Sequence, residues 1–391
     1  MDTKVLVLED YKKTGVISAV DLEKIREAAE VLKAGGLVAF PTETVYGLGG
    51  DGRRGDVSAR IYAAKGRPSD NPLIVHISRM EELTPLVKAV PETCRKLAGA
   101  YWPGPMTLVM DKSDVIPGET TGGLDTLAVR MPVHPVAAKL IELSGVPVAA
   151  PSANRSGRPS TTTAQHCIED LDGRIDMILD GGPCDIGVES TIVDLTEAKP
   201  VLLRPGAVTV EMLTATLGEE PLRDKAIVRA LEAGEKPKAP GMKYRHYAPQ
   251  APLVVVRAKA IGDAEQNAAA ACGDAAEAAG RNKERVARRI LELAGEYLAE
   301  GLRTEIICTE ECAQRIRQEA TYTEHASALP IRILGKETES LKISRNLFAV
   351  LRDTDGDRAD RLIAEGFAEN DLFLAIMNRL KKAAGWQVEE V

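Results

Sequence analysis

The first half of the chain alternates between amphipathic stretches and short apolar runs. Apolar residues at helical spacing predict helices over residues 22–34, 57–64, 92–101 and 135–144. Short apolar runs predict strands over residues 37–40, 72–77, 106–110, 126–130, 146–150, 175–180 and 190–194. Several of these strands follow one another with no helix between them. This order favours an α/β or α+β domain with a mixed sheet over a regular doubly wound sheet.

The second half of the chain begins with a polar stretch, about residues 207–235, whose pattern predicts helix. Residues 236–249 follow, and their prolines and glycine exclude both a helix and a central strand. This segment also carries two tyrosines, a histidine, an arginine and several lysines, which a plain linker does not need.

Beyond this segment, strands alternate with helices. The pattern predicts strands over 252–257, 304–308 and 331–334, and helices over 264–280, 285–301, 343–354 and 371–384. Such alternation indicates a small parallel α/β domain. We therefore expect a first domain over 1–210, a linker over 211–250 and a second domain over 251–391.

Composition narrows the class of protein. The 391 residues carry a net charge of −8 and include no basic tail or run, which disfavours tight RNA binding. No apolar run approaches the roughly 18–20 residues of a membrane helix, and no signal-peptide pattern follows Met1. The six cysteines are scattered, and only Cys308 and Cys312 are close, so we expect buried reduced thiols and no metal site. These features favour a cytoplasmic protein without membrane contact.

Two short stretches about 85 residues apart carry the most informative polar chemistry. Lys65-Gly66-Arg67-Pro68 places two cations at alternate positions, and Pro151-Ser152-Ala153-Asn154 places a hydroxyl and an amide at alternate positions. Alternate positions of an extended chain share one face, so we expect these groups to converge on a polyphosphate. The chain has no G-x-x-x-x-G-K-[ST] loop, so a nucleotide must be held another way. It also has no G-x-G-x-x-G in the second domain, so we expect no second nucleotide site there.

Other stretches add hydroxyls and cations. The loop over 41–50 supplies the alternating hydroxyls of Thr42, Thr44 and Tyr46. Arg130 ends a predicted strand, where a guanidinium is well suited to a carboxylate, and Arg204 lies at a Pro-Gly turn. Taken singly, each feature also fits an ordinary role as a loop, a solvated helix end, a surface ion pair or, for His76, a core histidine.

Taken together, eight motifs in order resemble the threonylcarbamoyl-AMP synthase family in its two-domain form. The motifs are PTETVYGLG at 41–49, KGRP at 65–68, NPL at 71–73, WPGPMT at 102–107, VRMP at 129–132, APSAN at 150–154, ESTIVD at 189–194 and RPG at 204–206. The segment PGMKYRHYAP at 240–249 is similar to the linker of the two-domain form. The resemblance is looser around residues 344–352.

The resemblance implies a YrdC-type first domain, a twisted mixed sheet with a concave cleft, and a smaller Rossmann-like second domain. It also implies a nucleotidyltransferase that condenses L-threonine, bicarbonate and ATP into threonylcarbamoyl-AMP and pyrophosphate. Mg²⁺ accompanies the ATP, and the resemblance assigns no protein ligand to it. Other proteins then transfer the threonylcarbamoyl group to adenosine in tRNA, so the enzyme itself need not bind tRNA tightly.

The resemblance further implies roles for residues of this chain. Lys65 and Arg67 are the expected catalytic cations. The threonine site is expected to contain Thr44, His76, Arg130, Ala150 and Ser190. The ATP site is expected to contain Lys65, Arg67, Asn71, Thr126, Ser152, Asn154, Ser160, Arg204 and Tyr244, with Tyr244 carried by a linker that folds over the cleft as a lid.

Two alternative functions are weighed against this one. A carbamoyl-transfer enzyme of hydrogenase maturation uses a similar domain, but it also carries zinc-finger cysteine pairs and an acylphosphatase module that this sequence lacks. An RNA-binding or ribosome-associated module of the YrdC type is the other alternative. The acidic balance and the scarcity of aromatic residues argue against it.

Overall fold

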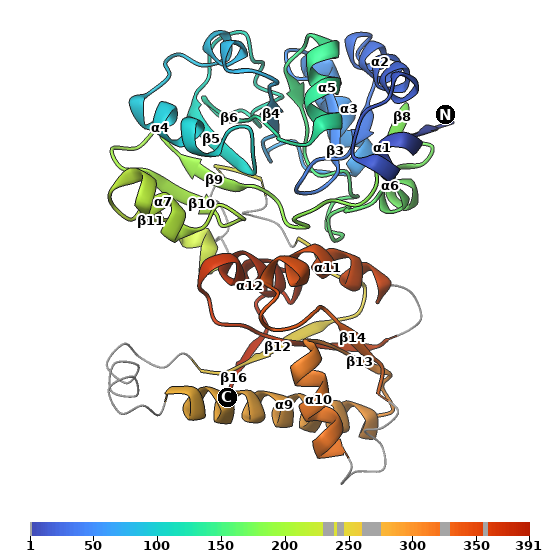
Figure 1. Cartoon of the computed structure of the whole chain (residues 1–391), viewed down its shortest axis with the longest axis vertical. Helices are drawn as coiled ribbons and strands as arrows, with labels where there is room; N and C mark the ends of the chain where they lie inside the picture. The colour runs from blue at the N-terminus through green and yellow to red at the C-terminus, as the bar shows by residue number, and fades with distance from the viewer. Residues whose placement is uncertain (1, 230–237, 241–245, 260–274, 321–328, 355–358) are drawn as a thin grey trace. The chain divides into compact units, whose positions relative to one another are not determined.

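The computed structural model divides the chain into two compact units, Met1–Tyr244 and Arg245–Val391 (Figure 1). It describes all residues except 1, 230–237, 241–245, 260–274, 321–328 and 355–358. Within this described part, no helix is both long enough and apolar enough to cross a membrane.

The first unit is built on a mixed sheet of eleven strands in the order β1-β8-β2-β3-β7-β4-β6-β5-β9-β10-β11. The strands are β1 (Lys4–Val7), β2 (Val38–Phe40), β3 (Gly47–Asp51), β4 (Ile74–His76), β5 (Met106–Asp111), β6 (Thr126–Arg130), β7 (Val148–Ala149), β8 (Met177–Asp180), β9 (Thr191–Asp194), β10 (Val201–Arg204) and β11 (Leu222–Arg223). Parallel and antiparallel neighbours both occur: β4 pairs β6 in parallel, whereas β6 pairs β5 in antiparallel. The mixed sheet expected from the sequence is confirmed.

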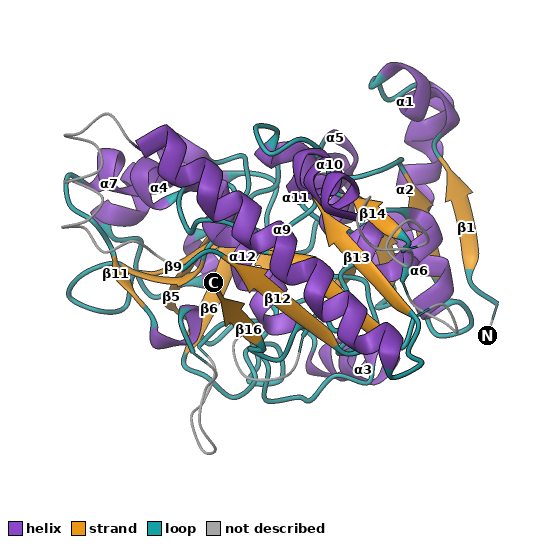
Figure 2. Cartoon of the chain, turned by 90° about the horizontal axis from the view of Figure 1, so that it is seen from below, coloured by secondary structure: helices purple, strands orange, loops and turns teal. Residues whose placement is uncertain are grey.

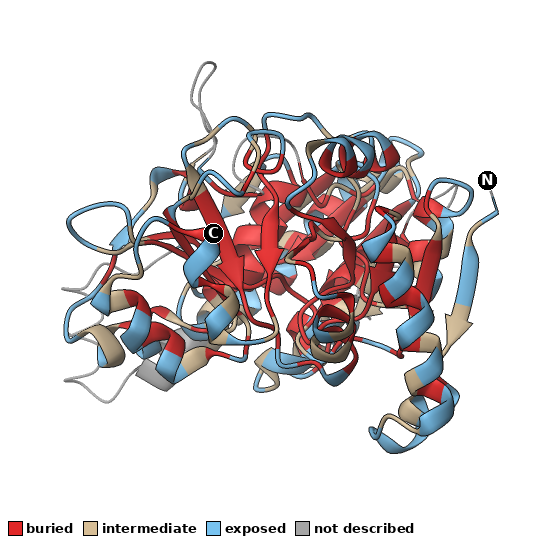
Figure 3. Cartoon of the chain, turned by 90° about the horizontal axis from the view of Figure 1, so that it is seen from above, coloured by how far each residue is buried: buried red, intermediate tan, exposed pale blue. Residues whose placement is uncertain are grey.

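Helices surround this sheet, and exposed positions concentrate on the outer helices and loops (Figure 3). They are α1 (Glu9–Thr14), α2 (Ala19–Lys33), α3 (Gly55–Lys65), α4 (Glu92–Tyr101), α5 (Pro135–Ser144), α6 (Ala164–Leu171) and α7 (Val210–Leu217), with 3-10 turns at Met80–Glu82, Thr84–Leu86 and Lys225–Ile227. The apolar faces of α2 and α5 pack with β2 and β8 into one buried cluster. The amphipathic pattern predicts these faces because buried residues recur at helical spacing.

Local chemistry explains where the predicted helices begin and end. Ser18 caps α2 by accepting a hydrogen bond from the backbone N–H of Asp21 at 3.1 Å. Pro135 occupies the first turn of α5, and Gly145 ends that helix in the left-handed conformation with φ of 63°. The predicted bounds of α4 and α5 match the structure.

Two predictions for the first unit need correction. The stretch over 207–235 is not helical throughout: α7 ends at Leu217, and β11 and a 3-10 turn follow before the described residues stop at 229. β1 was not predicted, although Val5-Leu6-Val7-Leu8 is an apolar run; β1 is an edge strand paired with β8, and its four residues are exposed or only half-buried.

The second unit is a parallel sheet between two helix layers, as Figure 1 shows. Its strand order is β14-β13-β15-β12-β16, with β12 (Leu253–Arg257), β13 (Thr304–Cys308), β14 (Ile331–Ile333), β15 (Arg361–Glu365) and β16 (Val388–Glu390). Helices α9 (Ala275–Ala299) and α10 (Glu310–Ala320) cover one face, and α11 (Ser340–Asp353) and α12 (Asp371–Ala383) the other (Figures 1 and 2). The parallel α/β fold is confirmed, although the sequence analysis missed β15, a strand in the middle of the sheet.

The carboxyl ends of β13 and β15 form the point where this sheet changes sides. The chain leaves β13 for α10 on one face and leaves the neighbouring β15 for α12 on the other. Glu365 ends β15 and accepts a 2.7 Å hydrogen bond from the backbone N–H of Thr309. Burial raises the pKa of Glu365 to about 7. Cys308 and Cys312 beside it are buried free thiols, as expected.

Candidate active site

A row of polar side chains crosses the sheet of the first unit where β4 and β6 end. His76 on β4 is registered with Arg130 on β6, and Arg130 with Thr107 on β5. Thr107 is registered with Ile192 on β9, and Ile192 with Arg204 on β10. Registered neighbours point to the same face of a sheet, so distant parts of the chain place these groups side by side.

Arg130 is the centre of this row. It is 4% exposed, and its Nη1 donates a 2.8 Å hydrogen bond to the hydroxyl of Thr44. Its Nη2 lies 2.6 Å from Oε1 of Glu43, and both side chains of this ion pair are 5% exposed. The hydroxyls of Thr42 and Thr44 lie 2.9 Å apart. The loop after β2 therefore surrounds a buried guanidinium with hydroxyls and one carboxylate.

The hydroxyl of Tyr46, expected to act with those of Thr42 and Thr44, has a different partner. Tyr46 points its hydroxyl away and donates to the carbonyl of Gly182 at 2.7 Å. Burial raises the pKa of this phenol well above its ordinary value, so it stays neutral. The prediction that Thr42, Thr44 and Tyr46 act together is wrong for Tyr46, because the loop is not a strand and does not alternate.

Arg204 and Ser190 extend the row at β9 and β10. Arg204 is buried and donates to the carbonyl of Ser190 at 3.0 Å and to its hydroxyl at 3.1 Å. The same hydroxyl lies 2.8 Å from that of Thr107. Arg204 also donates to the carbonyl of Pro240 at 3.5 Å. The structure thus links the predicted Arg204 and Ser190 through Thr107 to the row containing Arg130.

His76 is a neutral group in this row. Burial and the neighbouring Arg130 lower its pKa to about 3. Its Nδ1 lies 3.1 Å from the carbonyl of Ile74, and the backbone N–H of Ala150 donates to the same carbonyl at 2.8 Å. His76 can therefore form hydrogen bonds near neutral pH without adding positive charge beside Arg130.

The side chain of Lys65 binds the backbone of the second predicted stretch, residues 151–154. Its Nζ donates to the carbonyls of Ser152 and Asn154, and its own carbonyl accepts from the N–H of Ser156 at 2.8 Å. Lys65 is the last residue of α3, and Gly66 follows with φ of 61°. The expected extended geometry of Lys65 and Arg67 is therefore wrong, although Lys65 and the 152–154 stretch are together as expected.

Arg67 reaches a different backbone segment. Its Nε donates to the carbonyl of Asn71 at 3.3 Å, and its Nη2 to that of Pro72 at 3.1 Å. Asn71 is 1% exposed, and within the described part of the chain neither polar atom of its amide has a hydrogen-bond partner. A buried amide without partners costs free energy, which marks Asn71 as a group suited to a ligand.

Ser152, Asn154 and Ser160 are held by local hydrogen bonds. The hydroxyl of Ser152 donates to Oδ1 of Asn154 at 2.5 Å, and Nδ2 of Asn154 donates to the carbonyls of Arg155 and Arg158. The hydroxyl of Ser160 donates to Glu189 at 2.6 Å, next to Ser190. Through Glu189, Ser160 is therefore linked to the Arg204 end of the row.

The expected residues thus fall into two groups at opposite ends of β4 and β6. His76, Arg130, Ser190 and Arg204 lie at the carboxyl ends, where the side chain of Arg130 also reaches Thr44, whereas Asn71 precedes β4 and Thr126 begins β6. Four residues along a strand separate Thr126 from Arg130 by about 13 Å. Tyr244 lies outside the described residues. The sequence analysis missed Glu43, Thr107 and the Pro240 carbonyl, and the only available signal was the place of Glu43 between two threonines.

A short piece of the predicted linker covers the same face of the sheet. Ala239 is fully buried in a cluster with Ile74, Val109, Ala128 and Ile192. Nζ of Lys238 lies 3.2 Å from a carboxylate oxygen of Asp194 on β9. Apolar contacts, an ion pair and the Arg204–Pro240 hydrogen bond therefore anchor residues 238–240 beside the row.

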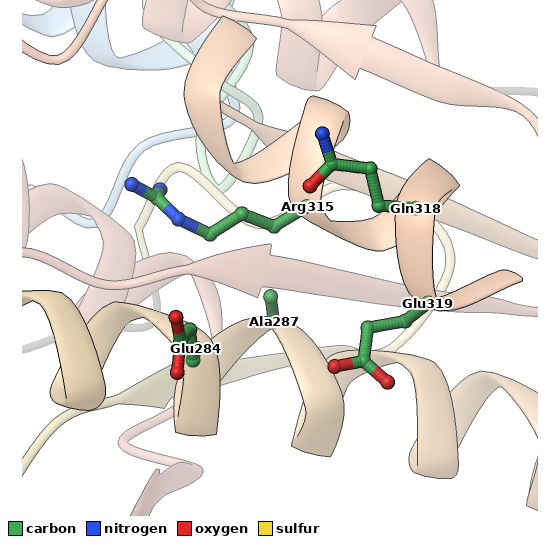
Figure 4. Close-up of a pocket in the computed structure, with 5 residues that line it drawn as sticks. All are labelled: Glu284, Ala287, Arg315, Gln318 and Glu319. Carbon is green, nitrogen blue, oxygen red and sulfur yellow. The ribbon is translucent and has the colours of Figure 1, made fainter.

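The second unit has its own surface hollow of about 290 Å³ between α9 and α10 (Figure 4). Glu284, Ala287, Arg315, Gln318 and Glu319 line it. None of the predicted site residues lies there. Among the described residues of the whole chain, no three His, Cys, Asp or Glu side chains gather in a way that could hold a metal ion.

The fold and this site define a mixed α/β protein whose main sheet carries buried cations, hydroxyls and a neutral histidine suited to small anionic ligands. Comparison with known proteins narrows this class. Residues 30–206 match the model of the Sua5, YciO and YrdC family, described as telomere recombination, and residues 208–385 match the C-terminal domain of threonylcarbamoyl-AMP synthase.

Curated relatives agree with the family models. The chain is 45% identical over 368 residues to threonylcarbamoyl-AMP synthase of Pyrococcus abyssi, covering 94% of this chain and 96% of the relative. It is 43% identical to that of Bacillus subtilis, covering 93% and 94%. The crystal structure of Pyrococcus abyssi Sua5 complexed with L-threonine superposes with a TM-score of 0.82 at 42% identity, covering 100% of both chains.

The chain belongs to the threonylcarbamoyl-AMP synthase family, in the form that carries both domains. It is an ATP-using enzyme of the nucleotidyltransferase type that acts in tRNA modification. The resemblance found in the sequence and the enzyme function it implied are confirmed. The alternative of a pure RNA-binding module is set aside by the same comparisons.

Proposed function

We propose that this enzyme condenses L-threonine, bicarbonate and ATP into threonylcarbamoyl-AMP and pyrophosphate. The observation that carries the proposal is the buried guanidinium of Arg130 at the end of β6, held by the hydroxyl of Thr44. A buried arginine that faces hydroxyls is suited to the carboxylate of an amino acid. The relative of known structure binds L-threonine, which supports the same substrate here.

The proposed chemistry rests on positioning. The amine of threonine attacks bicarbonate or carbon dioxide to give a carbamate, whose oxygen attacks the α-phosphorus of ATP while pyrophosphate leaves. Arg130, Thr44, His76, Ser190 and the backbone at Ala150 hold threonine. No covalent enzyme intermediate is needed, so alignment and charge neutralisation supply the rate enhancement.

The ATP site is proposed around the second group of residues, with Ser160 and Arg204 reaching it from the row that contains Arg130. The members that hold the nucleotide are Lys65, Arg67, Asn71, Thr126, Ser152, Asn154, Ser160 and Arg204, with Tyr244 added from the linker. Lys65 and Arg67 neutralise charge that gathers on the phosphates. Mg²⁺ brought by ATP would add further neutralisation of the phosphates.

The linker is proposed to act as a lid. Residues 238–240 lie against the sheet beside Arg204, which supports a role for this segment at the site. A lid excludes water, which otherwise destroys the carbamate and the mixed anhydride. We place the enzyme in the cytoplasm, where separate proteins that transfer the threonylcarbamoyl group to tRNA take up its product.

The test is pyrophosphate release from ATP and Mg²⁺ with L-threonine and bicarbonate omitted in turn. Release that needs both substrates is the expected result. Release that needs neither indicates a nucleotide hydrolase and overturns the proposal. If no pyrophosphate forms, a gel shift with tRNA at physiological salt decides whether the chain binds RNA instead.

A further inference from the structure

Glu43 lies beside Arg130 but is not used by the chemistry described above. Both side chains are buried, and Oε1 of Glu43 lies 2.6 Å from Nη2 of Arg130. This approach lacks hydrogen-bond geometry, and neither carboxylate oxygen accepts a hydrogen bond from any residue that the structure describes. A buried carboxylate normally needs such donors, because burial removes the hydrogen bonds of water. Glu43 is therefore a buried side chain whose two oxygens accept no hydrogen bond from the described residues and whose ion-pair partner is Arg130.

A purely structural partner of Arg130 is expected to look different. Arginine and carboxylate pair best through two parallel hydrogen bonds, and such pairs are the strong ones. Here Arg130 donates hydrogen bonds to the hydroxyl of Thr44 at 2.8 Å and to the carbonyl of Gly104 at 3.4 Å instead. Oε1 of Glu43 thus has the ion pair with Arg130 but no hydrogen bond among the described residues, and Oε2 likewise accepts none from them.

An α-amino acid is the natural complement of an adjacent arginine and glutamate. It carries a carboxylate and an ammonium group on one carbon atom, and the ammonium offers three donors. We propose that Glu43 binds the ammonium group of the threonine substrate, while Arg130 binds its carboxylate, and that Glu43 takes up one ammonium proton. This inference rests on the proposed function and adds a catalytic residue to it.

The titratable side chains beside Glu43 add no second negative charge that competes with it for the ammonium. The other titratable groups near it, besides Arg130, are His134 at the start of α5 and Cys184 after β8. Burial lowers the pKa of His134 to about 4 and raises that of the Cys184 thiol well above its ordinary value, so both are neutral near pH 7. Asp185 also influences His134, but it is exposed.

One proton moves from the ammonium nitrogen to a carboxylate oxygen of Glu43, and the nitrogen keeps the electron pair. That pair forms the nitrogen–carbon bond to bicarbonate while the carbon–hydroxyl bond breaks. The departing hydroxide takes a second proton from the nitrogen and leaves as water. The product is the carbamate, and Glu43 later returns its proton to solvent.

The test compares L-threonine with its α-hydroxy analogue, 2,3-dihydroxybutyrate, which keeps the carboxylate but lacks the ammonium. In wild-type enzyme, calorimetry is expected to show threonine binding about 10- to 100-fold more tightly, the range of a hydrogen bond to a charged group. In Glu43→Gln this preference is expected to disappear, with the KM for ATP unchanged. The pyrophosphate rate of the variant is expected to recover as pH rises, because unprotonated amine then arrives from solution.

The matched control is Asp21→Asn, which removes another fully buried carboxylate of the same unit. Asp21 accepts a hydrogen bond from the N–H of Tyr11 at 2.8 Å, so its loss is expected to lower stability without changing the preference for threonine. Equal binding of threonine and the analogue by active wild-type enzyme overturns the inference, even if Glu43→Gln fails to fold. Wild-type enzyme that forms no pyrophosphate from threonine overturns the proposed function instead.

Discussion

The guanidinium of Arg204 holds Ser190 at two points, its backbone carbonyl at 3.0 Å and its hydroxyl at 3.1 Å. Arg204 belongs to β10, whereas Ser190 immediately precedes β9. The contact therefore fixes how the start of β9 lies against β10, beside the candidate active site. The hydroxyl of Ser190 is thereby placed 2.8 Å from that of Thr107. One arginine positions a predicted substrate group while remaining buried itself.

Arg204→Lys is expected to lower both stability and activity. A lysine cannot reproduce the planar fork that reaches two acceptors, so one buried acceptor loses its donor. The free energy of unfolding is expected to fall by about 1–3 kcal/mol in urea titration, and pyrophosphate release with it. Arg223→Lys, at an exposed pair with Glu220, is the control and is expected to change neither quantity measurably. Equal behaviour of the two variants is inconsistent with the structural role of Arg204.

Arg67→Ala tests the predicted triphosphate site. If Arg67 neutralises the phosphates, its loss is expected to cost roughly 2–4 kcal/mol of transition-state stabilisation, by analogy with removal of one oxyanion donor. The measurement is kcat/KM for pyrophosphate release. Arg26→Ala on α2 serves as the comparison, since the Arg26 side chain is 52% exposed and pairs only with Glu23 among the ion pairs described. Wild-type rates in Arg67→Ala remove this residue from the site.

Asn71→Leu is expected to separate folding from function. The buried amide of Asn71 has no hydrogen-bond partner among the described residues, so an apolar side chain of similar size relieves an unfavourable burial. The unfolding free energy is expected to rise by about 1–2 kcal/mol, while the KM for ATP increases. Thermal unfolding and steady-state kinetics measure the two effects. A variant that loses stability and keeps its KM indicates a structural asparagine instead.

Stability is expected to fall at mildly acidic pH because of His76. Burial lowers its pKa from 6.5 to about 3, so below pH 6.5 the unfolded chain binds a proton that the folded chain does not. Stability is therefore fully present above pH 6.5 and is lost progressively as pH falls toward 3. By about pH 5, the shifted pKa of His76 is expected to have lowered the free energy of unfolding by about 2 kcal/mol. Urea titrations of wild type and His76→Gln at about pH 7.5 and 5 are expected to show a smaller loss in the variant.

Glu365 in the second unit is expected to give the opposite pH dependence. Its pKa is raised from 4.5 to about 7, so between these values the unfolded chain has released a proton that the folded chain keeps. Stability is full below pH 4.5 and falls as pH rises to 7, by up to about 3 kcal/mol. Glu365→Gln is expected to remove this decline and to make the second unit more stable than wild type at about pH 8. Hydrogen exchange of β15 in the full chain is the measurement, and identical pH profiles contradict the prediction.

The sequence predicted most elements because local chemistry decides them. The helix over 92–101 and the helix over 135–144 were found with their ends, since amphipathic spacing, Pro135 and Gly145 act within a few residues. β15 was not predicted, although it is the central strand of its sheet. Its residues Arg361–Glu365 have polar ends around a short apolar middle, and only burial against two neighbouring strands makes them a strand.

In the site, too, local sequence predicted some features and only the tertiary structure decided others. The order of motifs along the chain identified the family, and the residue types Lys65, Arg67 and Arg130 were found without a structure. Which residues share a face was decided only by the tertiary structure. The assumption of alternation kept Thr42, Thr44 and Tyr46 together and passed over Glu43, but the loop is irregular and turns Glu43 toward Arg130 instead.

The sequence by itself determined the fold class, the alternation of elements in each unit and the kinds of side chain available for chemistry, because these follow from local spacing and residue type. The tertiary structure alone decided that His76, Arg130, Thr107 and Arg204 form one row. Their proximity comes from strand pairing between segments far apart in the chain, as between β4 and β6 or β9 and β10. Such pairing depends on the packing of the whole sheet, which no short stretch of sequence encodes.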